Sequence, residues 1–340
     1  MLTEKENFLM LLRGERPEWV PSYTILPMPN AEKPIPCHML TPPFINYHRK
    51  NGVGGVDIWG VRYVATAEAA GATLPEPNNF ILKDITKWRD VIRAPDMSGY
   101  DWEKMAKGHI DDSGIDRSQT ALSFDVHFGY FQHLMSFMGF TDGLCALFEE
   151  PDEVKELLGY LCDFYCAVTE NLIDLYGPDI LSLKDDTAAW GSPFMSKDMY
   201  DDIFVPLYDR HARFARERGI PVSFHNCGKC ETLVDSLVGI GVKLWDPAQT
   251  CNDLAAVKAK YGNSLVLAGG WDARGRLLED DVSDEELIES VRASMDMLAP
   301  GGGYAFSGGF LSAVGDAAAM RKNAVIHREA FEYGQSFYKK

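Results

Sequence analysis

The chain has 340 residues, of which 46% are hydrophobic and 24% charged, a composition typical of a soluble globular protein. Its formal net charge of −17 argues against non-specific binding to nucleic acid or to an anionic membrane surface. No apolar run reaches the roughly 18 residues of a membrane span, and the N-terminus lacks the basic and apolar pattern of a signal peptide. Seven cysteines, an odd number, do not indicate a disulfide framework. We therefore expect a cytoplasmic protein.

The first third of the chain predicts irregular structure. Residues 3–13 have the pattern of a short amphipathic helix, and residues 16–48 then contain eight prolines. Because proline disfavours helices and central strands, we expect this segment to be extended and to cover a barrel mouth or line a pocket. Residues 56–64 predict a strand or hairpin, and residues 75–116 predict a surface excursion with a short helix near 88–92.

From residue 120 the chain alternates between strands and helices. Helices are predicted at 152–175, 198–217, 230–238, 252–260, 284–298 and 316–337, and strands at 120–125, 180–184, 220–225, 242–245, 265–268 and 303–306. Ser283 and Glu286 form a capping-box pattern before one of these helices. Such alternation predicts a parallel sheet. With the upstream strand at 56–64, a distorted (β/α)8 TIM-type barrel fits better than an open sheet. We expect one barrel domain over 1–340, with 1–50 as an N-terminal extension packed on it.

The stretch around His225 carries the clearest chemical signal. In a barrel, the loops that follow the strands form the active site. His225 and Cys227 stand at the end of a predicted strand and, two residues apart, point to the same side. Imidazole and thiolate are preferred zinc ligands. The third ligand stays open among several residues near strand ends: Cys230, Cys251, Asp185, Asp186 or a residue near Ser307. The alternative interpretation is that His225 and Cys227 merely line a pocket.

Other polar residues at strand ends are candidates for catalysis or substrate binding. Asp185 and Asp186 are predicted to act as catalytic acids, to bind a cation or to cap a turn. Because neighbours in an extended chain point to opposite sides, we expect one to face the pocket and the other the surface. Asp57 is either part of the pocket lining or an ion-pair partner of Arg62. The candidate substrate-binding residues are Asp57, Trp59, His127, Trp271 and Ser307.

Several of these stretches together resemble the uroporphyrinogen decarboxylase superfamily. They are Ile180-Leu-Ser-Leu-Lys-Asp-Asp, Ser192-Pro193, Phe224-His-Asn-Cys-Gly, Trp271-Asp and the late glycine-rich strand, within roughly residues 50–335. The resemblance implies a distorted βα barrel. The true decarboxylases carry an arginine-containing motif, Met-Arg-Gln-Ala-Gly-Arg, that binds substrate carboxylates, and residues 15–50 contain nothing like it.

The other branch of the superfamily consists of cobalamin-dependent methyltransferases. Their zinc site resembles His-x-Cys plus a distant cysteine near the last strand. His225 and Cys227 match the first two ligands, whereas Ser307 or Gly308 stands where the distant cysteine is expected. The stretches 56–61 and 245–250 are most similar to members of the O-demethylase type.

The resemblance implies a methyltransferase that moves a methyl group from a small methylated substrate, foremost a methoxylated aromatic, to a corrinoid protein. Zinc or an acid would assist the transfer, cobalamin would be carried by the partner, and a homodimer is a candidate assembly. Two alternatives stay open. One is a decarboxylase that uses Arg62, Lys184, Lys229 and Arg274 as cations. The other is a non-catalytic protein that binds a corrinoid or tetrapyrrole.

Overall fold

The computed structural model describes residues 2–24, 35–50, 53–65, 72–126, 129–311 and 315–339. Within these ranges, one parallel sheet of seven strands curls into a distorted barrel, which confirms the predicted fold class. Its order is β1 (Cys37–Leu40), β5 (Ala121–Phe124), β6 (Ile180–Lys184), β7 (Val222–His225), β8 (Val242–Ala248), β9 (Val266–Gly270) and β10 (Tyr304–Ser307). Beyond β10, Ser22 forms a parallel bridge with Phe306, so the chain near Ser22 lies where a further strand would stand.

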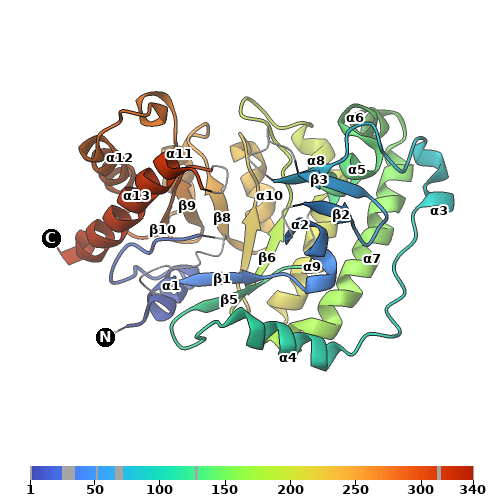
Figure 1. Cartoon of the computed structure of the whole chain (residues 1–340), viewed down its shortest axis with the longest axis horizontal. Coiled ribbons are helices and arrows are strands. Elements are labelled where there is room, and N and C mark those ends of the chain that lie inside the picture. Colours follow the sequence, from blue (N-terminus) through green and yellow to red (C-terminus); the bar gives the residue numbers. More distant parts are fainter. Residues whose placement is uncertain are drawn as a thin grey trace.

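Helices surround this sheet (Figure 1). They are α5 (Tyr130–Met138), α6 (Phe140–Glu149), α7 (Pro151–Tyr176), α8 (Lys197–Ile203), α9 (Val205–Arg216), α10 (Val234–Gly239), α11 (Leu254–Tyr261), α12 (Asp284–Leu298) and α13 (Ala317–Ser336). The capping box of Ser283 and Glu286 is present at α12. The single helix predicted over 198–217 is two, because Pro206 lacks the N–H that would continue α8. No helix in the described part of the chain is long and apolar enough to cross a membrane.

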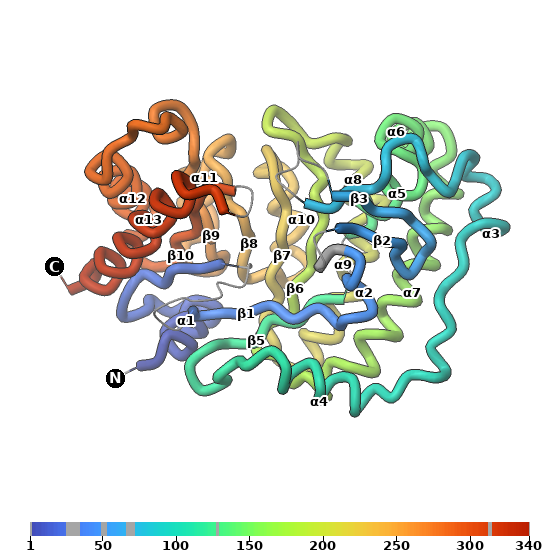
Figure 2. Tube along the Cα trace, viewed as in Figure 1, coloured from blue at the N-terminus to red at the C-terminus, as the bar shows by residue number. Residues whose placement is uncertain are grey.

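The proline-rich segment is more regular than predicted. Residues 37–40 form β1, which pairs with β5 at one end of the strand order, as the trace in Figure 2 shows. This strand lies between Pro36 and Pro42 and contains no proline itself. The segment then forms α2 (Pro43–Lys50), where proline at the first position costs no hydrogen bond. The expectation that 16–48 is extended and irregular is therefore wrong at α2, and at β1 it is wrong only in that this extended stretch is a regular strand. Residues 25–34 lie outside the described ranges.

The segment 56–64, predicted as a strand or hairpin, does not join the barrel. It is a hairpin of β2 (Gly54–Val56) and β3 (Arg62–Ala65), which β4 (Thr73–Pro75) extends to a separate antiparallel sheet. The chain reverses because the Asp57 carboxylate accepts hydrogen bonds from the backbone N–H groups of Trp59, at 2.9 Å, and Val61, at 2.8 Å. The short helix predicted near 88–92 is α3 (Trp88–Val91), and α4 (Trp102–Ser113) follows it.

One end of the barrel is closed by α1 (Glu4–Leu12). Its Phe8, Leu11 and Leu12 form a buried cluster with residues of the barrel strands, among them Cys37, Ala121, Ile180, Leu244, Ala268 and Ala305. Because these strands come from all around the sheet, the cluster marks the interior face of the barrel. Side chains alternate along a strand, so His225, Asp246 and Ser307 also face the interior, nearer the carboxyl ends of the strands.

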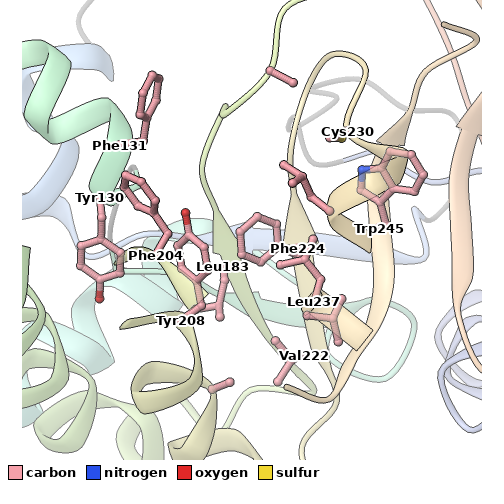
Figure 3. Close-up of a cluster of buried hydrophobic side chains, with 14 of the residues drawn as sticks. Tyr130, Phe131, Leu183, Phe204, Tyr208, Val222, Phe224, Cys230, Leu237 and Trp245 are labelled. Atoms are coloured by element: carbon pink, nitrogen blue, oxygen red, sulfur yellow. The ribbon is translucent and has the colours of Figure 1, made fainter. Parts of the chain in front are cut away.

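The opposite face of the strands packs on the helices. Phe224 of β7 lies against Tyr208 of α9, with ring centroids 4.9 Å apart, in the aromatic cluster of Figure 3. Tyr130 and Phe204 extend this cluster toward α5 and α8. Burial of these rings holds β7 in place, and the next residue along, His225, is thereby presented to the barrel interior.

Candidate metal centre

Three strand ends meet at the carboxyl mouth of the barrel. Lys184 of β6 is the register partner of His225 of β7, and His225 is the register partner of Asp246 of β8. The three side chains therefore start from neighbouring positions at one level of the barrel interior. This is the end of the barrel at which α/β barrels place their active sites.

Asp186, His225 and Cys227 form a compact group of donor atoms. One ligand atom from each lies within 4.8 Å of the others. Cys227 Sγ is 3.5 Å from His225 Nε2, and Asp186 Oδ1 is 3.8 Å from the same nitrogen. Asp186 is oriented by the backbone N–H of Cys227, at 2.9 Å, and by the amide of Gln132, at 3.0 Å. A nitrogen, sulfur and oxygen donor set is one that zinc accepts.

Asp246 orients the histidine of this group. His225 Nδ1–H donates to Asp246 Oδ2 at 2.8 Å, which leaves Nε2 directed at Cys227 and Asp186. Protein zinc sites commonly use such a carboxylate behind a ligating histidine. Burial lowers the pKa of His225, but Asp246 and Cys227 outweigh it and raise this pKa well above its ordinary value. The surroundings of His225 therefore favour an added positive charge.

Asp185 points away from this group. Its buried carboxylate accepts hydrogen bonds from the backbone N–H groups of Phe131, at 2.8 Å, and Gln132, at 3.1 Å, and from the Tyr208 hydroxyl, at 2.7 Å. It therefore caps the first turn of α5. Burial raises the pKa of Asp185 to about 7, against these three hydrogen bonds. The two neighbouring aspartates do face different sides, but Asp185 is directed into the protein rather than toward the surface.

Cys230, predicted as a zinc ligand, is not brought to the donor group. Its thiol is buried and donates to the backbone carbonyls of Asn226, at 3.4 Å, and Gly228, at 3.6 Å. The chain turns at Gly228, which has a φ of 90° and lies so close to Ala188 that a Cβ would sit 2.4 Å from its carbonyl oxygen. This tight turn separates Cys230 from Cys227.

Two of the predicted substrate-binding residues have structural contacts within the protein. Asp57 holds the β2–β3 turn, and Arg62 pairs with Glu76 at 3.3 Å. Trp59 is buried and donates to the Tyr165 hydroxyl at 2.8 Å. These contacts account for both side chains without a ligand.

The other three predicted substrate-binding residues differ in their placement. Trp271 donates to Ser290 Oγ at 2.8 Å, and its ring fills the space beside Gly308. Ser307 ends β10 and, two residues after Ala305, faces the barrel interior. His127 lies outside the described residues. Among the described residues of this set, only Ser307 is placed on the interior wall.

Each of the four candidate cations is paired with a carboxylate. Besides Arg62, Lys184 pairs with Asp125 at 2.8 Å, Lys229 with Glu231 at 3.4 Å, and Arg274 with Asp272. The arrangement therefore differs from a cluster of uncompensated cations.

The fold and the site together define an α/β-barrel protein with metal-type ligands at the carboxyl ends of its strands. The family model described as uroporphyrinogen decarboxylase (URO-D) matches residues 128–314, more than half of the chain. The chain therefore belongs to the uroporphyrinogen decarboxylase family, as its motifs suggested. No curated protein matches the sequence.

The same architecture occurs in a solved structure. A methyltransferase from Methanosarcina mazei is similar with a TM-score of 0.61 and 12% identity, over 98% of this chain and 99% of that chain. A putative vitamin-B12 independent methionine synthase from Listeria monocytogenes has a TM-score of 0.45 and 10% identity, over 71% of this chain and 72% of that chain. At such identities, the first of these likenesses establishes the fold.

Proposed function

We propose that this protein is a methyltransferase that moves a methyl group from a small methylated compound, foremost a methoxylated aromatic, to a corrinoid carried by a partner protein. The observation that carries the proposal is the group of Asp186, His225 and Cys227 at the barrel mouth. The fold shared with a protein described as a methyltransferase supports it.

The donor group fits zinc. It combines one imidazole, one thiol and one carboxylate, its histidine is held by a carboxylate, and the acidic surroundings of His225 favour an added positive charge. Asp186, His225 and Cys227 would hold the ion, which supplies a Lewis acid for the atom that the methyl group leaves. The surrounding residues position these ligands. Gln132 and the Cys227 N–H orient Asp186, and Asp246 orients His225.

A direct assay tests this function. The purified protein is mixed with zinc, free cob(I)alamin as methyl acceptor, and 2-methoxyphenol or a methoxybenzoate. We expect the cob(I)alamin absorbance to decay while the demethylated phenol accumulates, as measured by mass spectrometry. Cobalamin binding without phenol formation from any methylated compound would favour the non-catalytic alternative. Carbon dioxide release from a porphyrinogen carboxylate would favour the decarboxylase.

Removal of the carboxylate behind His225 should weaken metal binding. In Asp246→Asn, the amide no longer favours the His225 tautomer that presents Nε2, and we expect the affinity for zinc to fall by about 10- to 100-fold. Competition with a chromophoric chelator measures this change. Asp272→Asn is the matched control, since Asp272 bonds to Thr250 and Arg274 rather than to His225. Equal affinities in the wild type and Asp246→Asn would contradict the assigned role.

A further inference from the structure

Lys184 extends into the barrel mouth. It ends β6, and β5 lies between β6 and β1 in the sheet. Nevertheless, its Nζ is 3.8 Å from Met39 Sδ on β1 and 2.8 Å from Asp125 Oδ2 just after β5. A side chain from β6 reaches β1 only by crossing β5 on one face of the sheet. Met39 is two residues after Cys37 of the interior cluster, so the face that Lys184 crosses is the barrel interior.

The surroundings of Lys184 hold a cation in a nearly buried place. Its side chain is 12% exposed, and that of Asp125 is fully buried. The Thr41 hydroxyl donates to the same Asp125 oxygen at 2.8 Å, so this carboxylate is held toward Lys184. The paired charge offsets much of the cost of removing the ammonium group from water. The thioether of Met39 is only a weak acceptor, so a negatively charged oxygen would replace it as the stronger partner.

We propose that Lys184 is a catalytic residue that donates a hydrogen bond to the substrate oxygen as it loses its methyl group. The inference rests on the proposed function and deepens it by naming a side chain that stabilises the leaving oxygen in addition to the Lewis acid. Lys184 and His225 are register partners, so their side chains start from neighbouring strands at one level of the barrel interior, and the Lys184 ammonium group extends from there toward Asp125 and Met39. Asp185, which was predicted as an acid for this step, is engaged with α5 instead.

The charges of the step balance without a proton. The bond between the oxygen and the methyl carbon breaks, and its electron pair stays on the oxygen, which becomes a phenolate. The new bond to the methyl carbon is made by the electron pair of the Co(I) corrinoid on the partner protein. The ammonium group of Lys184 stabilises the negative charge that develops on the oxygen, and the phenolate takes up a proton from water after release. Preorganised donors of this kind typically contribute about 10²- to 10³-fold in rate.

Binding of 4-nitrophenol tests the inference without turnover. This phenol is yellow when ionised, so absorbance reports the form in which it binds. We expect the wild type to shift bound 4-nitrophenol toward the phenolate, Lys184→Arg to retain the shift, and Lys184→Met to lose it. Lys229→Met is the matched control, because it removes the same charge from the next βα loop, where Lys229 bonds to the Cys251 carbonyl and Glu231. Loss of the shift in Lys229→Met, or no shift in the wild type, would overturn the inference.

A second variant separates chemistry from folding. Lys184→Met leaves Asp125 buried without its cation, whereas Asp125→Asn combined with Lys184→Met removes both charges and keeps an oxygen for Thr41 to donate to. We expect this double variant to fold and still to lose the phenolate shift. A double variant that binds phenolate as the wild type does would overturn the inference.

Demethylation of a graded series of methoxybenzenes distinguishes the two proposals. If the wild type demethylates them, Lys184→Met should be about 10²- to 10³-fold slower, and most impaired with the least acidic leaving phenols. Demethylation that is independent of Lys184 refutes the inference and leaves the proposed function standing. Phenolate binding that depends on Lys184, with no demethylation of any substrate, refutes the proposed methyl transfer and supports Lys184 as the oxygen-binding cation.

Discussion

Alanine at Asp186, His225 or Cys227 is expected to remove zinc from the protein and abolish methyl transfer. Each substitution deletes one of three donors that lie within 4.8 Å of one another, and zinc centres of this kind rely on three protein ligands. The metal content should fall from about one ion per chain in the wild type to near zero in each variant. Mass spectrometry of protein purified without chelators measures this content, and the cob(I)alamin assay measures the activity.

Cys230→Ser is the matched control for the metal prediction. It alters a nearby cysteine whose thiol donates to the carbonyls of Asn226 and Gly228, and serine keeps a donor there. We expect it to retain zinc. Loss of zinc in Cys230→Ser together with retention in Asp186→Ala would show that Cys230, rather than Asp186, is the third ligand. A wild type that takes up no zinc would refute the metal centre altogether.

Asp185→Asn is expected to change how stability depends on pH. The pKa of Asp185 is raised from an ordinary value of 3.8 to about 7 by burial. Its contribution to the free energy of unfolding is therefore greatest below about pH 4 and is lost as the pH rises through about 7. The difference between these two pKa values corresponds to about 4 kcal/mol. Asparagine does not titrate, so the stability of the wild type minus that of Asp185→Asn should decrease over this range.

Urea unfolding at a series of pH values measures this difference. Asp174→Asn is the control of opposite sign, because its hydrogen bond with Arg218 lowers the pKa of Asp174. For this pair, the stability of the wild type minus that of Asp174→Asn should increase with pH. The increase should be slight, since Asp174 is exposed to solvent. A difference for Asp185→Asn that stays constant or increases with pH would show that the three hydrogen bonds keep this carboxylate ionised.

The sequence predicted two of the three metal-type donors, because their relation is local. His225 and Cys227 are two residues apart at a strand end, and strand geometry alone brings them to one side. Asp186 was one of several candidates for the third position. Its orientation depends on Gln132, 54 residues away, and on the N–H of Cys227, 41 residues away. No local pattern distinguishes Asp186 from Asp185, which is occupied by the first turn of α5.

Asp246 and Lys184 acquire their roles only through strand pairing. Both are polar residues at strand ends, and that position is visible in the sequence. The registers of β6, β7 and β8 place Asp246 on one side of His225 and Lys184 on the other. Strand geometry could have identified Asp246. Leu244 faces the barrel interior, and Asp246, two residues later on the same strand, faces the same side.

The sequence by itself determined the alternation of strands and helices after residue 120, since hydrophobic periodicity and helix capping act over a few residues. It also determined the His-x-Cys pair, and its motifs pointed to the family. Tertiary structure decided that residues 37–40 rather than 56–64 join the barrel, that Asp186 meets His225 and Cys227, and that Lys184 reaches the mouth. These contacts join residues that are distant in sequence. Their geometry depends on sheet register and helix packing, and local sequence patterns do not reveal either.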